Sequence, residues 1–240
     1  MFVFRRKNLI IVSVLIITAI TFALCFGALS VKSIGNYDKG AVKVVLDAGH
    51  GGIDGGVVGI NTKVKESELN LKVVKKLEKY LVNAEIAVIL TRETDAGLYG
   101  VATSNLKKKD MQKRREIILN ADPTLVISVH MNKYSVSTRR GAQVFYKPSD
   151  EEGKLLANSI QDSFNGMKEA TRPFSALTGD YYILNCSDYP SVICECGFLS
   201  NPEDEALLIT DEYQDKIAYA IFKGIINYLA GETTSVPEFN

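Results

Sequence analysis

Short apolar runs alternate with longer amphipathic stretches along this chain. The apolar runs predict strands at residues 43–47, 86–91, 124–130, 141–147 and 191–197, with a short one at 181–184. The amphipathic or capped stretches predict helices at residues 66–82, 110–120, 149–164, from 201 and 211–230, with Ser149, Asn201 and Asp211 as caps. Alternating strands and helices imply a single α/β domain whose central sheet is mostly parallel and flanked by helices.

The first 31 residues have a different composition. Arg5, Arg6 and Lys7 precede 23 residues without a charge, at 9–31. About 20 apolar residues span a bilayer, so residues 1–31 are expected to be a retained membrane anchor, with a cleaved signal segment as the alternative. The basic residues place the N-terminal side in the cytoplasm and the rest outside. A linker is expected at 32–41, the folded domain at 42–231 and a flexible tail at 232–240.

The charges are balanced. The chain has 28 basic and 28 acidic residues, which argues against a nucleic-acid partner. One dense basic stretch, KKKDMQKRR at 107–115, is interpreted as the solvated face of a helix. An electrostatic role against an anionic polymer is the alternative.

The cysteines do not form a recognisable motif. Cys25 lies in the apolar segment, and Cys186, Cys194 and Cys196 lie in the domain. Cys194 and Cys196 share one face of a predicted strand, where neighbours are poorly placed for a disulfide. A cysteine-based metal site lacks a fourth ligand with recognisable spacing, so core packing is expected.

A glycine-rich loop follows the first predicted strand. The stretch VVLDAGHGGIDGGVVG, at 44–59, has six glycines within eleven residues and includes His50. It matches neither GxGxxG nor GxxxxGK[ST], and no helix opens directly after it, so a nucleotide site is not expected.

The chain has only two histidines, and both follow strands. His50 lies just beyond the first strand and His130 ends TLVISVH. Ligands of a parallel sheet bind beyond the carboxyl ends of its strands, where both imidazoles are expected to meet. Two imidazoles suggest a zinc ion, which also accepts a carboxylate ligand. Glu66 and Glu68 are the candidates for that third ligand, although acids at a helix start can simply complement the helix dipole.

Glu195 is a second conspicuous acid. It lies within SVICECGF, a strand that is otherwise apolar or small. Carboxylates are rarely buried without partners, and desolvation would raise the pKa of Glu195 towards that of a general base near neutrality. The following residues border the same edge and are expected either to support the ligands or to cap loops: Asp47, Asp54, Arg92, Asp95 and Asn132.

Several separated motifs, in order, resemble the zinc-dependent N-acetylmuramoyl-L-alanine amidases of the amidase_3 family. They are VVLDAGHGGIDGG, ESELN, LTRETD, NADPTLVISVHMN, GAQVFY and CECGFLSNPEDEALL, within residues 42–208. The resemblance implies that His50, Glu66 and His130 bind Zn²⁺ and that Glu195 is the catalytic glutamate. The chain departs from the family pattern at Ala48, where proline is usual, and at Ser67, where lysine is common. The second departure leaves Glu68 as the alternative to Glu66.

One apolar N-terminal segment beside a bare catalytic domain is similar to the spore-cortex amidases of the CwlD type. The similarity implies that the enzyme removes stem peptides from peptidoglycan as the cortex forms muramic-δ-lactam. It also implies an extracytoplasmic location, between the forespore membranes and attached through residues 1–31. The sequence identifies neither an accessory protein nor an oligomeric state.

Two other functions are compatible with the same residues. Another zinc amidohydrolase, such as a carboxypeptidase or a sugar deacetylase, would use the same ligand types; the HExxH metalloprotease pattern is absent. An inactive wall-binding scaffold is the non-enzymatic alternative, and the presence of all four site residues argues against it.

Overall fold

A computed structural model describes residues 42–170 and 172–231 of the chain. The predictions for residues 1–31, 32–41 and 232–240, including the one for Cys25, lie outside the described residues. Within the described part, no helix combines the length and the apolar character that crossing a membrane requires.

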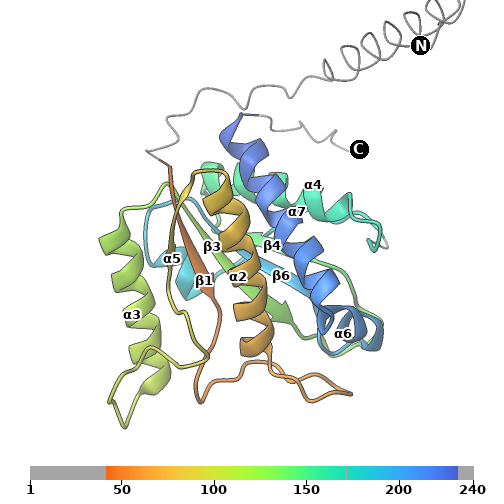
Figure 1. Ribbon diagram of the computed structural model, residues 1–240, viewed down its shortest axis with the longest axis horizontal. Helices are drawn as coiled ribbons and strands as arrows, with labels where there is room; N and C mark the ends of the chain where they lie inside the picture. Colours follow the sequence, from red (N-terminus) through yellow and green to blue (C-terminus); the bar gives the residue numbers. More distant parts are fainter. Residues whose placement is uncertain (1–41, 171, 232–240) are drawn as a thin grey trace, which may run out of the picture. The chain divides into compact units, whose positions relative to one another are not determined.

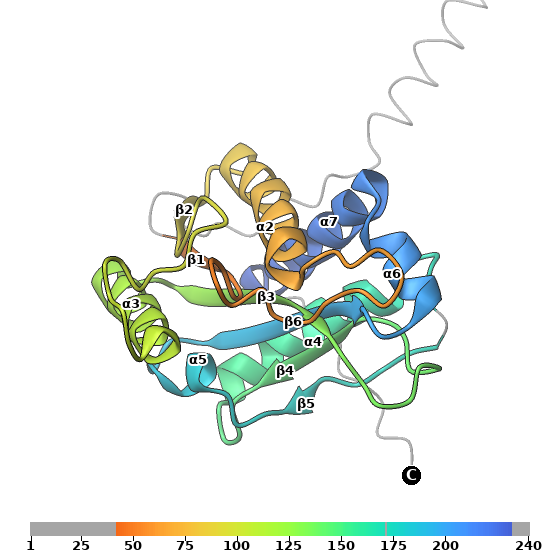
Figure 2. The ribbon, with the colours of Figure 1, turned by 90° about the horizontal axis from the view of Figure 1, so that it is seen from below.

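Six strands form one sheet in the order β2–β1–β3–β6–β4–β5 (Figures 1 and 2). They are β1 (Lys43–Ala48), β2 (Ala87–Leu90), β3 (Leu125–Asn132), β4 (Gln143–Tyr146), β5 (Leu177–Thr178) and β6 (Ser191–Phe198). Four of the five neighbouring pairs are parallel, and β4 runs antiparallel to β6. The α/β class and the flanked central sheet are therefore confirmed, and the sheet is mixed.

Helices cover both faces of this sheet. They are α2 (Glu66–Asn83), α3 (Leu106–Ala121), α4 (Glu151–Asn165), α5 (Tyr182–Asn185), α6 (Pro202–Leu208) and α7 (Asp211–Leu229). Buried side chains of α2, α4 and α7 share the larger apolar cluster with one face, and those of α3 and α5 share a smaller cluster with the other. Figure 2, seen from below, places the loop between β1 and α2 in front of the strands.

The strands divide their side chains between the two clusters in strict alternation. In β1, Val44 and Leu46 enter the larger cluster and Val45 enters the smaller one. The same period of two is expected of any strand. Cys194 and Cys196 both enter the larger cluster as free, buried thiols, which confirms the prediction of core packing.

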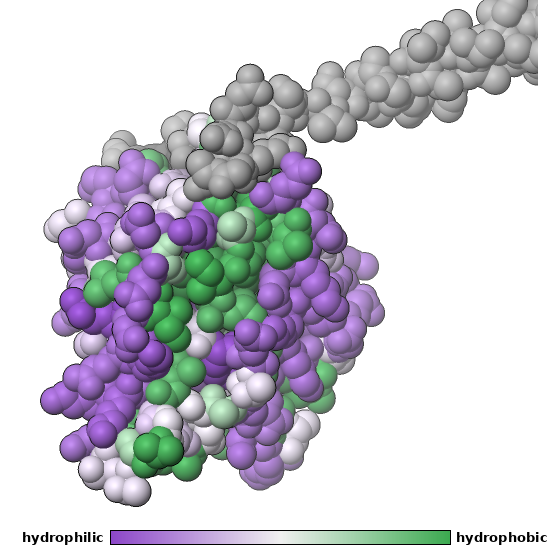
Figure 3. Space-filling model, turned by 60° about the vertical axis from the view of Figure 1, so that its left-hand side comes forward, coloured by the Kyte–Doolittle hydropathy of each residue, from purple (hydrophilic) through white to green (hydrophobic). Residues whose placement is uncertain are grey.

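The edge strand β2 is less covered. Its Val88, Ile89 and Leu90 are only partly buried. Figure 3 brings this side of the molecule forward and shows a hydrophobic band between hydrophilic borders. The sheet therefore remains partly exposed to solvent along β2.

Three elements differ from the sequence predictions, and one of them, the two-residue strand β5, was not predicted. Residues 181–184 were expected to form a strand, but Tyr182–Asn185 form the short helix α5. Ile183 and Leu184 are consecutive and both buried, which a helical turn allows and an alternating strand does not. Helix α3 begins at Leu106, four residues earlier than predicted. The sequence did not indicate this first turn, because it is lysine-rich and shows no apolar periodicity.

Two of the three expected caps are shifted by one residue. Asp150 rather than Ser149 accepts a hydrogen bond at the start of α4, and Thr210 rather than Asp211 does so at α7. Asn201 caps α6 as expected, with Pro202 in the first turn. Adjacent polar residues are all suitable caps by type, so the backbone conformation decides between them.

Candidate metal centre

A cleft of about 730 Å³ opens where β1, β3 and β6 end. Its floor continues the sheet face that α3 and α5 cover, because side chains in register on neighbouring strands lie on the same face. Towards the carboxyl ends of the strands, the side chains on this face change from apolar to polar. Asp47 comes two residues after Val45, His130 four residues after Val126 and Glu195 two residues after Ile193, so each pair lies on the same face. The alternation therefore delivers three ionisable side chains to one cleft.

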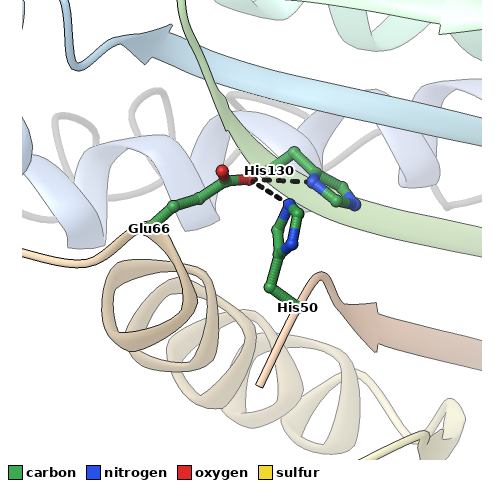
Figure 4. A group of neighbouring side chains, drawn as sticks. All are labelled: His50, Glu66 and His130. Atoms are coloured by element: carbon green, nitrogen blue, oxygen red, sulfur yellow. Dashed lines mark hydrogen bonds and ion pairs between the residues drawn. The ribbon is translucent and has the colours of Figure 1, made fainter. Parts of the chain in front are cut away.

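His50, Glu66 and His130 come together in this cleft (Figure 4). Glu66 Oε1 lies 3.3 Å from His50 Nε2 and 2.9 Å from His130 Nδ1. The two imidazole rings lie edge to face, with centroids 5.1 Å apart. One ligand atom from each residue lies within 4.8 Å of the others, so the group is suited to holding one metal ion.

His50 is held from behind by a carboxylate. Its Nδ1 lies 3.0 Å from Asp54 Oδ2, which leaves Nε2 facing Glu66. Burial disfavours the charged imidazole, but the hydrogen bonds and charges of Glu66 and Asp54 outweigh it and raise the pKa of His50 to about 9. A metal ligand must be deprotonated, so a cation bound here takes the place of that proton.

Glu66 is the first residue of α2, and its side chain is only 2% exposed. Its Oε2 accepts a hydrogen bond of 2.8 Å from the Val57 amide, and its Oε1 accepts one of 3.1 Å from the Met131 amide. Burial opposes ionisation, but His130 and His50 outweigh it and hold the pKa of Glu66 far below its usual range. Glu66 is therefore an ionised carboxylate fixed between two imidazoles.

Two glycines of the loop make this packing possible. A Cβ at Gly49 would lie 2.1 Å from Cε1 and 2.3 Å from Nε2 of His130. Gly56 has φ +68°, and a Cβ there would lie 2.4 Å from Glu66 Oε2 and 2.8 Å from His50 Cδ2. The loop is therefore glycine-rich because its backbone runs directly against the three side chains.

Two buried arginines fix the backbone that carries His50. Arg92 donates from Nε to the Ala48 carbonyl at 2.8 Å and from Nη2 to the Gly49 carbonyl at 3.0 Å. Arg114 donates from Nη1 to the Ala48 carbonyl at 2.8 Å and from Nη2 to the His50 carbonyl at 2.6 Å. Each carbonyl from Ala48 to His50 thus accepts a hydrogen bond from a guanidinium group, which fixes the backbone from which the His50 side chain extends.

Asp47 neutralises Arg114 beneath the cleft. The Arg114 guanidinium donates to the Asp47 carboxylate and, at 2.7 Å, to Asp110. Thr91 and Ser128 donate hydroxyl hydrogen bonds of 2.7 and 2.6 Å to Asp47. Burial alone would raise the pKa of Asp47, but the Arg114 charge and these two hydroxyls lower it to about 2. The network is charged and almost fully hydrogen-bonded.

Glu195 is a further carboxylate beside His50, Glu66 and His130, and it differs from Asp47 because it lacks hydrogen-bonding partners in the described part of the chain. It lies opposite His130 in the register of β3 and β6. Its buried Oε2 has no hydrogen-bond partner among the described residues. Burial raises the pKa of Glu195 to about 7, with the Glu66 charge adding to the rise and the two histidines opposing it. A carboxylate with this pKa can both accept and donate a proton near neutral pH.

The structure sorts the remaining predicted residues. Glu68, the alternative to Glu66, is half-buried on α2 and outside the ligand group. Asp54 supports His50 directly, and Asp95 contacts the glycine loop through its backbone carbonyl. The Asn132 side chain accepts a hydrogen bond of 2.7 Å from the next amide, that of Lys133.

Arg114 is the residue of this site that sequence reasoning missed. It lies in the basic stretch interpreted as a solvated face, yet Arg114 is the largest fully buried side chain. Buried Asp110, four residues earlier on the same helix, was the available signal, because acid and base at that spacing face each other. The rest of the stretch largely confirms the interpretation as a solvated face, because residues 107–109, 112, 113 and 115 are exposed and only Asp110 and Arg114 are buried.

The donor set fits a divalent transition metal. Two imidazoles and one ionised carboxylate are the ligand types of catalytic zinc sites, which leave a fourth position for water. Asp54 and the Val57 amide fix the ligands from outside, as is usual around such ions. An α/β sheet that carries this group, with an unpartnered glutamate beside it, has the features of a metal-dependent hydrolase.

Comparison with known proteins gives the family. Residues 44–227 match the Amidase_3 family model, described as N-acetylmuramoyl-L-alanine amidase. The germination-specific N-acetylmuramoyl-L-alanine amidase of Bacillus subtilis is 37% identical over 189 residues, which cover 77% of this chain and 78% of that protein. The chain therefore belongs to the Amidase_3 family and is an N-acetylmuramoyl-L-alanine amidase.

Solved structures agree with this assignment. The CwlD amidase of Clostridioides difficile, solved in complex with the GerS lipoprotein, has a TM-score of 0.76 at 36% identity, over 79% of this chain and 99% of that one. An N-acetylmuramoyl-L-alanine amidase from Clostridium difficile 630 has a TM-score of 0.70 at 27% identity, over 79% of this chain and 97% of that one. The resemblance inferred from the sequence motifs is confirmed.

Proposed function

We propose that residues 42–231 form a zinc-dependent catalytic domain that hydrolyses the amide between N-acetylmuramic acid and L-alanine in peptidoglycan. His50, Glu66 and His130 are the proposed zinc ligands, and Glu195 is the proposed catalytic residue. The observation that carries the proposal is the convergence of these three ligands, within 4.8 Å, beside a carboxylate without a hydrogen-bond partner on Oε2.

Glu195 moves the proton in this scheme. A bound zinc ion supplies Lewis-acid chemistry, polarising the scissile carbonyl and lowering the pKa of water to about 7. The ionised Glu195 accepts the proton of the attacking water and then donates it to the nitrogen of L-alanine as the amide bond breaks. Asp54 holds the His50 ring so that Nε2 faces the centre.

The biological setting is the finer part of the proposal. The germination-specific relative supports removal of stem peptides during spore cortex maturation, as a step towards muramic-δ-lactam. We place the domain outside the cytoplasm, attached to a membrane through residues 1–31. The lipoprotein bound to the CwlD neighbour supports an accessory protein for this chain as well.

Product analysis tests the reaction. Purified full-length protein with zinc is expected to release stem peptides from peptidoglycan, leaving muramic acid with a free lactyl carboxyl group. Treatment with a chelator should stop release, and added Zn²⁺ should restore it. Mass spectrometry distinguishes the alternatives, because a deacetylase frees acetate and a carboxypeptidase frees single terminal residues. Either of those products in place of stem peptides would contradict the proposal.

Glu66 and Glu68 form a matched pair on the same helix turn. Glu66→Ala is expected to lower zinc affinity at least tenfold, because it removes an ionised ligand, whereas Glu68→Ala should keep full metal content. Metal analysis after dialysis against a buffered zinc concentration compares the two variants. Unchanged zinc in Glu66→Ala, or loss of zinc in Glu68→Ala, would show that Glu66 is not the third ligand.

A further inference from the structure

We propose that Lys107 and Lys133 form a carboxylate-binding subsite in the catalytic cleft, which selects a stem peptide with a free carboxylate close to the scissile amide. The inference rests on the proposed function, because it assigns the peptide half of the substrate to one part of the same cleft. Both lysines line the cleft that contains His50, His130 and Glu195.

The two lysines reach the cleft from separate elements. Lys107 lies in the first turn of α3, and Lys133 directly follows β3, three residues after His130. Both residues are exposed, so their ammonium groups are accessible to a ligand. Three residues of extended chain span at most about 10 Å, so Lys133 is anchored within that distance of His130 along the backbone.

The acids of the cleft are already occupied, apart from Glu195. Asp47 and Asp110 accept hydrogen bonds from Arg114, Asp54 contacts His50, and Glu66 lies between two imidazoles. Neither Lys107 nor Lys133 has an acidic partner within salt-bridge distance among the described residues, and the charge of Lys107 acts only at longer range, where it helps to lower the pKa of Asp54. The cleft therefore presents two positive charges that an anionic ligand group can neutralise.

In a strand that has not yet been cleaved, the free carboxylates lie on the peptide side of the bond that is cut. The lactyl carboxyl of muramic acid is consumed in the scissile amide, so the nearby glycan offers hydroxyl and acetamido groups. The stem peptide supplies the free carboxylates. Two ammonium groups in the cleft therefore favour the peptide half and set the direction in which the substrate lies. A carboxylate within about three residues of the scissile amide falls within reach of a lysine side chain.

Paired substrates test the subsite. We compare a muramoyl peptide that has a free carboxylate on its second residue with the same peptide in which that group is a carboxamide. The full chain is expected to prefer the acid by about tenfold in kcat/KM, mostly through KM, because a charge-assisted hydrogen bond is lost in the amide. Lys107→Met and Lys133→Met should each reduce the ratio, and the double variant should abolish it.

The control is Lys108→Met, an exposed neighbour on α3 that does not line the cleft. It should keep the wild-type ratio, and high salt should reduce that ratio. Binding of both peptides to a Glu195→Gln variant, measured by calorimetry, gives a readout that does not need turnover. Equal affinity for acid and amide, or equal losses on both substrates in the lysine variants, would overturn the subsite. Cleavage of neither substrate by wild type would overturn the proposed function, and the binding ratio would still decide the subsite.

Discussion

Replacing Glu195 by glutamine is expected to lower kcat by about 10²–10⁴-fold while the protein keeps its zinc. Glutamine has nearly the same shape but cannot accept the proton of the attacking water. The metal is retained because Glu195 is not among the three grouped ligands. Peptide release and metal content are measured on the same sample. Full activity would exclude Glu195 from the reaction, and loss of zinc would make it a ligand.

The pH profile is the control for this variant. Glu195 accepts a proton only when ionised, so the wild-type rate should rise as pH increases through its pKa. That pKa is about 7 without a metal, and a neighbouring zinc charge lowers it, so the acid limb is expected at pH 7 or below. The residual activity of Glu195→Gln should lack this limb. An identical limb in wild type and variant would assign it to another group.

Arg114→Met is expected to destabilise the fold by about 3–5 kcal/mol, because it leaves Asp47 as a buried carboxylate without its cation. The matched control is Arg115→Met, the next residue, whose exposed guanidinium donates only to the Cys186 carbonyl. Urea unfolding of both variants measures the difference. Arg114→Lys should not restore stability, because an ammonium group cannot span the four acceptors of Arg114: Asp47, Ala48, His50 and Asp110.

The pH dependence of this loss has a definite sign. The pKa of Asp47 falls from an ordinary value of 3.8 to about 2 in the fold, so its contribution is complete above pH 4 and disappears as pH falls towards 2. The difference in unfolding free energy between wild type and Arg114→Met should therefore shrink over that range. A difference that stays constant down to pH 2 would contradict the assigned role of Asp47.

Part of this site could be predicted from the sequence because its residues lie in or directly after apolar runs. His130 ends an apolar run, so the rule that ligands bind beyond the carboxyl ends of parallel strands places it at this edge, and Glu195 stands out as an acid within an otherwise apolar or small strand. Glu66 was ambiguous with Glu68, because both are acids in the first turn of a helix. The register of the glycine loop brings Val57 and Gly56 against Glu66, so Glu66 rather than Glu68 lies with the two histidines.

Other features depend on contacts that no local pattern encodes. The spacing of Asp110 and Arg114 indicates an ion pair, but the burial of that pair depends on Asp47, 67 residues away from Arg114, which accepts its hydrogen bond. Residues 181–184 were predicted as a strand because four residues are too few to reveal a period, and burial against β6 and α3 decided for a helical turn.

The direction of β1 separates the ends of the described domain from the cleft. The described chain enters at Val42, at the amino end of β1, and leaves near the same end of the sheet after α7 (Figure 1). The cleft lies past the opposite end, about 20 Å away along a six-residue strand. Immobilising the described domain at either of these ends should therefore leave the cleft accessible to long glycan strands.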